Sequence, residues 1–196
     1  MTIAALYVDA RGPYPSMPDV ETWDEARDAR RYAGPWPIVA HPACGPWGCL
    51  AHQYRGSEGG SELGVLAVTQ VRQWGGVLEH PAHSRLWIAC GLPRPGDGYD
   101  AHGGYSIATA QVEWGHVARK KTWLYLVGVP TWLVRTYGPP FPGRAPTHWI
   151  SGGLSAKHKG GRRPAGIKSC SAQQRRRTPP LFAQYLLTLA ASTRWR

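Results

Sequence analysis

The chain has 196 residues, enough for one domain with a sizeable core, and 42% of them are hydrophobic. No apolar run approaches the ~20 residues of a membrane-spanning helix, and the N-terminus lacks the basic region and apolar stretch of a secretory signal. We therefore expect no membrane partner and a cytoplasmic location, where the four cysteines remain thiols.

The formal net charge of +11 is distributed unevenly. Residues 1–113 contain all twelve acidic residues and eight of the Lys and Arg, whereas residues 114–196 contain fifteen Lys and Arg and no Asp or Glu. The second part also contains tryptophans, whose flat faces suit stacking on bases as well as packing in a core. We therefore expect a nucleic-acid partner, DNA in the first place. A basic surface that is merely solvated is the alternative.

The N-terminal part of the chain predicts a strand, a helix and a second strand. Residues 4–8 form an apolar run, typical of a buried strand, that ends at Asp9 and a loop with Gly and Pro. Residues 20–32 have acidic residues early and Arg later, the order that a helix dipole favours, so we predict a short helix there. Residues 38–40 predict the next strand, and Cys44 lies in the loop after it.

The middle of the chain continues this alternation. Residues 62–74 carry apolar side chains at helical spacing, and residues 77–78 predict a strand that Glu79 ends. Residues 107–112 and 122–128 predict two further strands joined by a basic turn. Alternating strands and helices with nearly continuous apolar strands predict an α/β fold with a Rossmann-like, doubly wound, mostly parallel sheet.

The C-terminal part predicts a basic irregular segment and a closing helix. Residues 139–177 are rich in Gly, Pro, Lys and Arg and have little periodicity. Thr178 offers a capping hydroxyl before two prolines, which predicts a helix start, and residues 181–191 have an apolar face. We expect a core over residues 1–138, then the basic segment, then a helix within 178–196 that packs back on the core.

Cys44 and Glu79 are the strongest candidates for chemistry. Each follows an apolar strand, and ligands gather beyond the carboxyl ends of strands in a parallel sheet, so we expect the two side chains to share one cleft. A thiolate that adds to a ring, together with a carboxyl group, is a way to activate a pyrimidine. The alternatives are a buried structural thiol at Cys44 and a helix-capping carboxylate at Glu79.

A zinc site is a further alternative in the loop that contains Cys44. Four residues of zinc-ligand type occur there at symmetric spacing: His41, Cys44, Cys49 and His52. Prolines on both sides of Cys44 stiffen the loop against wrapping four ligands around one ion. We therefore predict no metal ligand, and bound zinc would remove Cys44 as a nucleophile.

The order of these motifs resembles that of the DNA cytosine-5 methyltransferases, in the small and divergent form found among phage and prophage proteins. His-Pro-Ala-Cys-Gly-Pro-Trp-Gly at residues 41–48 is similar to the family's Pro-Pro-Cys-Gln-Pro-Phe-Ser loop, which carries the nucleophile. Val-Leu-Glu-His-Pro at 77–81 resembles its Glu-Asn-Val strand end. Residues 115–121 and the strand at 124–128 resemble its Gln-x-Arg-x-Arg motif and the strand after it. Order and spacing agree over residues 38–128.

The resemblance implies a methyltransferase-like fold and methyl transfer from S-adenosylmethionine to carbon 5 of a cytosine. Cys44 would add to carbon 6 of the ring, and Glu79 would hydrogen-bond ring nitrogen 3 and the exocyclic amine. Arg119 would hold the base carbonyl or a phosphate. Because the target base must leave the duplex, Trp47 would stack on it.

The resemblance also implies residues for the cofactor and for the nucleic acid. S-adenosylmethionine would bind at Asp9 and Gly12 after the first strand, with Asp24 at the ribose. That loop has one glycine where the family pattern Phe-x-Gly-x-Gly has two. A base-modifying enzyme with another donor and a non-catalytic DNA- or RNA-binding protein are therefore alternatives. The expected phosphate contacts are Lys121, Lys168, Arg175, Arg176 and Arg177.

Overall fold

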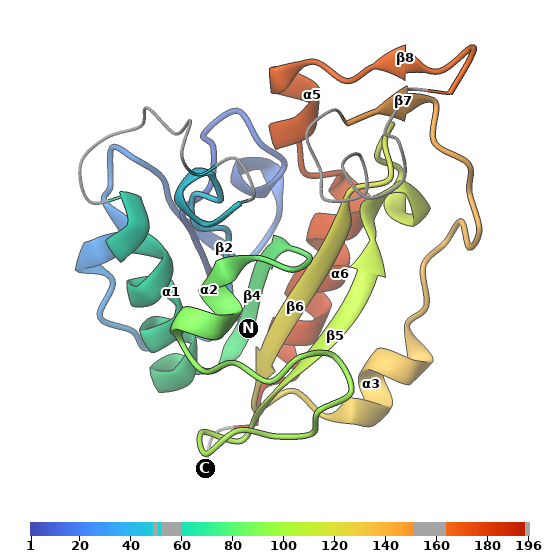
Figure 1. The fold of residues 1–196 in the computed structure, drawn as a ribbon. Coiled ribbons are helices and arrows are strands. Elements are labelled where there is room, and N and C mark those ends of the chain that lie inside the picture. The colour runs from blue at the N-terminus through green and yellow to red at the C-terminus, as the bar shows by residue number, and fades with distance from the viewer. Residues whose placement is uncertain (49–50, 52–59, 151–163, 195–196) are drawn as a thin grey trace.

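The computed structural model describes residues 1–48, 51, 60–150 and 164–194. These residues form a mixed α/β fold with a Rossmann-like arrangement, in which a central sheet lies between helices (Figure 1). The strands of the central sheet are β1 (Ile3–Leu6), β2 (Val20–Trp23), β3 (Ile38–Ala40), β4 (Gly76–Pro81), β5 (Gly104–Ala110) and β6 (Lys121–Val127). A small second sheet contains β7 (His148–Trp149) and β8 (Lys168–Ser169). The helices are α1 (Gly60–Trp74), α2 (Arg85–Ala89), α3 (Thr131–Thr136), α5 (Ala172–Arg176) and α6 (Pro180–Ala191).

The central sheet has six strands in the order β2-β1-β3-β4-β6-β5. Strands β1 to β4 pair in parallel, and β6 is antiparallel to both β4 and β5. The predicted mostly parallel sheet is therefore confirmed, with the reversed β6 as an addition. From β1 the chain goes to β2 on one side and to β3 on the other, so the topological switch point lies between β1 and β3.

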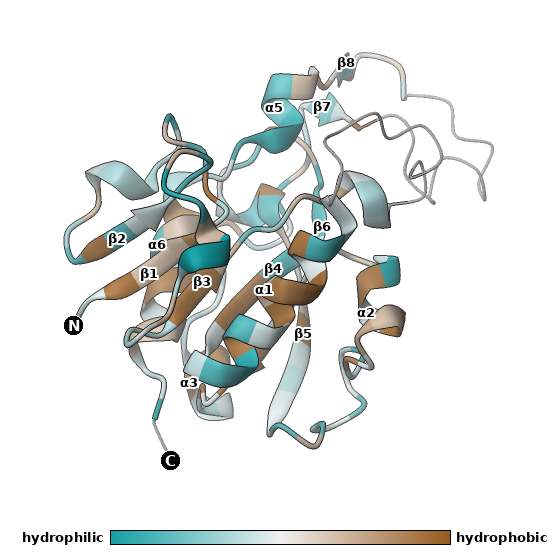
Figure 2. Ribbon diagram, turned by 90° about the vertical axis from the view of Figure 1, so that its left-hand side faces the viewer, coloured by the Kyte–Doolittle hydropathy of each residue, from teal (hydrophilic) through white to brown (hydrophobic). Residues whose placement is uncertain are grey.

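Apolar side chains cover both faces of this sheet. In β1, Ala4 and Leu6 pack with α1 and α2, whereas Ile3 and Ala5 pack with α6. Figure 2 shows the hydrophobic strands beside the partly hydrophobic helix α1. Successive strand residues point to opposite faces, so burial on both faces explains why these strands are continuously apolar in sequence.

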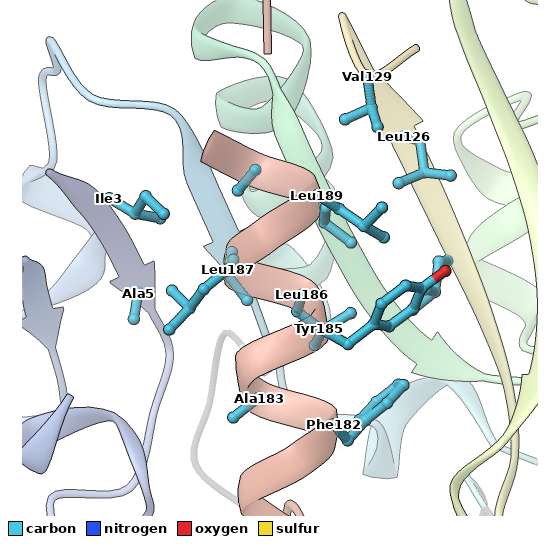
Figure 3. Close-up of a cluster of buried hydrophobic side chains, with 14 of the residues drawn as sticks. Ile3, Ala5, Leu126, Val129, Phe182, Ala183, Tyr185, Leu186, Leu187 and Leu189 are labelled. Carbon is cyan, nitrogen blue, oxygen red and sulfur yellow. The ribbon is translucent and has the colours of Figure 1, made fainter. Parts of the chain in front are cut away.

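Helix α6 closes the second face of the sheet. Its side chains Phe182, Leu186 and Leu189 are fully buried against the strands (Figure 3). The predicted cap is wrong, because Pro179 occupies the N-cap position and no side chain caps the helix. Pro180 is the first residue of the helix, where a backbone N–H would have no partner within the helix, so proline loses no hydrogen bond there.

Glycine is required where β3 and β4 approach each other. Gly76 has a φ of 113°, and a Cβ at this position would collide with the carbonyl oxygen of Ile38. This close approach fixes the register of β4, which carries Glu79.

The helix predicted over residues 20–32 is wrong. Val20–Trp23 is the edge strand β2, paired with β1, and a turn follows it before the short 3-10 helix Ala29–Arg31. The β-branched and aromatic residues of β2 fit a pleated strand, and pairing with β1 outweighs the charge order that favoured a helix.

The predicted irregular segment over 139–177 contains regular elements in its described part. Strands β7 and β8 pair in parallel, and α5 begins with a capping box between Ser171 and Gln174. This Ser-x-x-Gln spacing is a recognisable helix start. Helices α2 and α3 were also not predicted. In the described part of the chain, no helix is long and apolar enough to cross a membrane.

Candidate active site

One edge of the central sheet gathers the candidate residues. Strands β1 to β5 end at this edge and the reversed strand β6 begins there, at the top of Figure 1. The polar residues that the strands bring to this edge are Asp9, Asp24, His41, Cys44, Glu79, Gln111 and Lys120. The edge includes the switch point between β1 and β3, where open α/β sheets bind ligands.

Glu79 is the buried centre of this group, with 5% of its surface exposed. Its Oε2 lies 3.0 Å from Nδ1 of His41, and its Oε1 accepts a 2.9 Å hydrogen bond from Nε2 of Gln111. The Lys120 ammonium lies 3.9 Å from Oε1. Glu79 lies inside β4 rather than at its end, which corrects the predicted position. It does not cap the next helix either, because Ser84 caps α2.

The register of β3 and β4 explains the contact with His41. Ala40 pairs with Leu78, so the next residues, His41 and Glu79, lie side by side on the opposite face. His41 Nε2 is also 2.6 Å from the hydroxyl of the buried Tyr14. Glu79, His41 and Tyr14 therefore form a chain of polar contacts on a face of the sheet whose other buried side chains are mostly apolar.

Positive neighbours keep Glu79 ionised. Burial by itself raises its pKa, but the Lys120 ammonium and the hydrogen bond from His41 outweigh burial and lower the pKa to about 2. Glu79 is thus a fixed negative charge at neutral pH. It can accept hydrogen bonds but cannot donate a proton.

Cys44 begins the 3-10 turn Gly45–Trp47 after β3, and its side chain is exposed. Exposure of the residue argues against a buried structural thiol. Removal of part of the thiol's surroundings from water raises its pKa and Glu79 adds to this rise, whereas Lys120 and, more weakly, Arg176 oppose it. An exposed thiol with charged groups close by is placed to meet a ligand.

Arg119 and Lys120 have different environments. Arg119 is exposed, whereas only 18% of the Lys120 side chain is exposed and its ammonium approaches Glu79. The sequence-based choice of Arg119 missed Lys120, and it also missed Gln111 and Tyr14. Lys120 directly precedes β6, and its backbone N–H donates to the carbonyl of Ala118 in a tight turn, so strand alternation gives no signal for it.

The predicted cofactor residues lie at the ends of β1 and β2. Asp9 Oδ1 accepts the backbone N–H of Arg11, which lowers the pKa of Asp9, and the N–H of Gly12 donates to the Asp9 carbonyl at 2.8 Å. Asp24 directly follows β2, beside β1, and its Oδ1 accepts the N–H of Arg27. Its other oxygen has no hydrogen bond or ion pair with the described residues.

The basic C-terminal segment returns to this edge. Nε2 of His116 lies 2.9 Å from the carbonyl oxygen of Gln174 in α5, and the Gln174 side chain contacts His148 of β7. The charge of the exposed Arg176 in α5 favours lower pKa values for Asp9 and Cys44, as the weakest of several influences on each group. Four further predicted phosphate contacts are exposed: Lys121, Lys168, Arg175 and Arg177.

Trp47 packs against helix α1. A Cβ at Gly64 would lie 2.5 Å from Nε1 of Trp47, and this buried nitrogen has no hydrogen-bond partner in the described part of the chain. Stacking of Trp47 on a base stays a prediction, and it requires the ring to leave this position.

The zinc alternative has little support from His41. Both of its ring nitrogens have polar partners, Tyr14 and Glu79, so coordination would break one of these contacts. Cys49 and His52 lie outside the described residues. Within the described ranges, no group of three or more His, Cys, Asp or Glu could hold a metal ion.

No protein-family model, no curated protein and no solved structure matches this chain. The arguments for its function therefore come from the geometry and chemistry of the site.

Proposed function

We propose that this edge of the sheet is the active site of an enzyme that modifies a pyrimidine base in nucleic acid, in the manner of cytosine-5 methyl transfer. The observation that carries the proposal is the exposed Cys44 at the carboxyl edge of a Rossmann-like sheet, where Glu79 is held by His41, Gln111 and Lys120. It combines a nucleophile, a fixed anion and a cation in one place.

The chemistry begins with Cys44. Its thiolate adds to carbon 6 of the pyrimidine, a sulfur–carbon bond forms, and the electron pair of the ring double bond moves toward carbon 5. The Glu79 carboxylate can orient the amino side of the ring, because two oxygens have more acceptor positions than His41 and Gln111 occupy. Lys120 stabilises the negative charge that builds on the ring. Once carbon 5 carries the new group, loss of its proton returns an electron pair that expels the Cys44 thiolate.

The residues at the switch point fit a nucleoside-containing donor. Asp24 has a carboxylate oxygen without a partner in the described part of the chain, at the end of the strand beside β1, where acidic residues commonly hold ribose hydroxyls. S-adenosylmethionine, when bound, supplies an electrophilic methyl group. Asp9 and Gly12 form the tight turn at the end of β1, next to this position.

Charge supports a polyanionic substrate. Three arginines, Arg175, Arg176 and Arg177, lie in α5 or directly after it, and they are exposed, as is Lys168 of β8. Such a surface binds phosphates without reading sequence. We therefore propose a nucleic acid, DNA in the first place, as the partner.

A methyl-transfer assay tests this function. The full chain is incubated with isotopically labelled S-adenosylmethionine and, separately, DNA, RNA or free pyrimidine nucleotides. We expect label at carbon 5 of cytosine in a polymer, its loss in Cys44→Ser, and its retention in Cys90→Ser as the matched control. Label that persists in Cys44→Ser would contradict the role of this thiol.

A second candidate function is nucleic-acid binding without catalysis. It is favoured by the raised pKa of the Cys44 thiol and by the tight, single-glycine turn after β1. It predicts salt-dependent binding that is equal in the wild type and Cys44→Ser, with no transfer to any polymer. Transfer from a donor other than S-adenosylmethionine, dependent on Cys44, would instead indicate a different cofactor in the same site.

A further inference from the structure

We propose that the segment between α3 and β7 binds single-stranded DNA, whose bases stack on Tyr137 and Phe141 and whose phosphates contact Arg144 and Lys168. These four residues are referred to below as the stacking surface. The inference deepens the proposed function by assigning an unpaired form of the substrate, and it rests on that function only for the use of the bound strand. Binding itself is tested without a methyl donor.

Two aromatic rings of this segment are exposed. Tyr137 is 48% exposed and Phe141 is 42% exposed, although burial of such large apolar rings would be favourable. Within the described residues, neither ring contacts another aromatic ring. Trp132 of α3 is also exposed, but it shares a side of that helix with Arg135 rather than with Tyr137. The stacking surface therefore leaves two rings accessible to a partner.

Backbone hydrogen bonds hold the segment in place. The N–H of Tyr137 donates to the carbonyl of Leu133 at the end of α3. The N–H of Phe141 donates to the carbonyl of Glu113 at 3.1 Å, and the N–H of Gly143 donates to the carboxylate of Glu113 at 3.0 Å. Prolines further restrict the backbone of this segment. A fixed backbone presents the rings to a ligand with little loss of entropy on binding.

The residue that anchors the segment lies beside the candidate active site. Glu113 belongs to the 3-10 helix Gln111–Trp114, and Gln111 donates to Glu79 at 2.9 Å. Figure 1 shows this part of the chain running from α3 at the bottom up to β7 at the top, where the strands end. A DNA strand bound along the segment therefore leads toward the edge that carries Cys44.

Positive charge beside the rings favours a polyanion as the partner. The exposed Arg144 guanidinium lies 5.2 Å from the centroid of the Phe141 ring, a cation–π contact. The N–H of Lys168 donates to the carbonyl of Thr147, which places a second exposed cation at the end of the segment. Glu113 contacts the segment with its carboxylate engaged by a backbone N–H, and no Asp or Glu follows Glu113 in the sequence. Rings flanked by cations match the bases and phosphates of a nucleic-acid strand.

The exposed rings also favour an unpaired strand over a duplex. In a duplex the bases already stack on one another, so a ring on the protein surface finds no free base face. Unpaired bases stack on aromatic rings and on arginine guanidinium groups, whatever their sequence. A target base in such a stretch reaches an active site without first leaving a duplex.

Fluorescence anisotropy of labelled oligonucleotides with the full chain tests this surface. The probes are a single-stranded oligothymidylate and a hairpin duplex with the same number of phosphates, at one salt concentration. We expect Phe141→Ala and Tyr137→Ala each to weaken single-strand binding by about fivefold to a hundredfold and to change duplex binding by less than about twofold. Phe141→Trp should retain single-strand binding.

The dependence on salt separates stacking from charge. Arg144→Gln should reduce the slope of log affinity against log salt by about 0.7 for the single strand, because one phosphate contact is lost. Phe141→Ala should leave this slope unchanged, since a stacked base releases no counterion. A merely structural role of Phe141 would not produce this difference.

Two control variants remove exposed apolar side chains elsewhere. Tyr99 lies in the connection before β5 and is 64% exposed, and Ile88 of α2 is 74% exposed. Tyr99→Ala and Ile88→Ala should bind the single strand as the wild type does. Thermal melts confirm that each variant is folded, and sedimentation measures self-association.

Three results would overturn the inference. The first is wild-type binding of the single strand by both Phe141→Ala and Tyr137→Ala, and the second is an equal loss of duplex affinity in these variants. The third is a loss of self-association with unchanged oligonucleotide binding, which would assign the rings to a second copy of the chain. If single-strand binding depends on the rings but no base is modified, only the proposed function fails.

Discussion

A buried carboxylate organises the residues of the candidate site. Glu79 is removed from water, which costs several kcal/mol for an isolated ion. Three polar neighbours compensate: His41 and Gln111 through hydrogen bonds, and Lys120 through its charge. The arrangement fixes the ends of β3, β4 and β5 relative to one another, so it serves the fold as well as the chemistry.

Replacing Glu79 by Gln should therefore destabilise the protein in a pH-dependent way. The folded pKa of about 2 is below the usual 4.5, so the carboxylate stabilises the fold above about pH 4.5 and loses this contribution as the pH falls toward 2. We expect Glu79→Gln to lower the free energy of unfolding by roughly 2–3 kcal/mol at pH 7. Urea unfolding should show this gap narrowing at pH 3, with Glu62→Gln on α1 as the control; a gap that does not change with pH would contradict it.

His80 should make the fold sensitive to mild acid. It is 1% exposed, and neither ring nitrogen has a hydrogen bond of normal geometry within the described ranges, although the Ala43 backbone lies near. Its pKa is about 4 in the folded chain against an ordinary 6.5, so stability is complete above about pH 6.5 and declines toward pH 4. His80→Leu should flatten this decline by about 2 kcal/mol in urea unfolding between pH 7 and pH 5. Parallel pH profiles of the two proteins would refute the prediction.

Helix α6 illustrates how the second face of the sheet is stabilised. Its buried residues fill the space over β1, β3, β4 and β6, and Tyr185 stacks on Trp114 at a centroid distance of 4.2 Å. Leu181, one residue before the buried Phe182, is 48% exposed. The two positions therefore provide an internal comparison of burial in one helix.

Phe182→Ala should cost about 3–5 kcal/mol, because it removes a fully buried ring and leaves a cavity. Leu181→Ala should change stability by no more than about 0.5 kcal/mol. Chemical unfolding of both variants measures the difference. Similar losses at the two positions would mean that α6 does not pack on the sheet in this orientation.

The elements show what the sequence could predict. The strand at residues 38–40 and the helix over 62–74 were predicted because the spacing of their apolar residues directly reflects which side chains the element buries. Val20–Trp23 was misjudged because its strand character depends on pairing with β1, which is not visible locally. The order of acidic and basic residues there also occurs in helices.

The site was predicted in part for the same reason. Cys44 and Glu79 were predicted to lie at one edge because their strands were expected to run in parallel; β3 and β4 do so, although Glu79 lies inside β4. Lys120 and Gln111 could not, since their contacts with Glu79 depend on the reversed strand β6. Tyr14 could not either, since its contact with His41 depends on the pairing of β1 with β3. Sequence spacing alone does not show which side chains can bind a metal ion or a nucleic acid, because a side chain such as His41 can already be held by hydrogen bonds within the fold.

At the scale of the whole molecule, the uneven distribution of charge along the sequence corresponds to particular elements of the fold. The acid-free C-terminal part supplies both the helix α6 that supports the sheet and the helix α5 that carries the exposed Arg176. Figure 1 shows α5, β7 and β8 above the edge where the strands end. Three exposed arginines, Arg175, Arg176 and Arg177, thus lie on the segment that His116 holds through the carbonyl oxygen of Gln174.

Binding to nucleic acid should depend on salt through this region. We expect the slope of log affinity against log salt to fall by about 2 when Arg175 and Arg176 are both changed to Ala, because each phosphate contact releases about one counterion. The pair Arg31→Ala and Arg135→Ala removes the same charge elsewhere and should leave the slope nearly unchanged. Fluorescence anisotropy titrations at several salt concentrations measure the slopes of both double variants. Equal slopes would mean that Arg175 and Arg176 do not contact the nucleic acid.

The most direct measurement of the central claim is the intact mass of the chain after incubation with S-adenosylmethionine and an oligonucleotide that contains 5-fluorocytosine. Fluorine at carbon 5 cannot leave as a proton does, so an enzyme that adds Cys44 to carbon 6 stays bonded to the base. We predict an adduct of protein plus oligonucleotide in the wild type and in Cys90→Ser, and none in Cys44→Ser. The absence of any adduct, or an adduct that survives Cys44→Ser, would contradict the account.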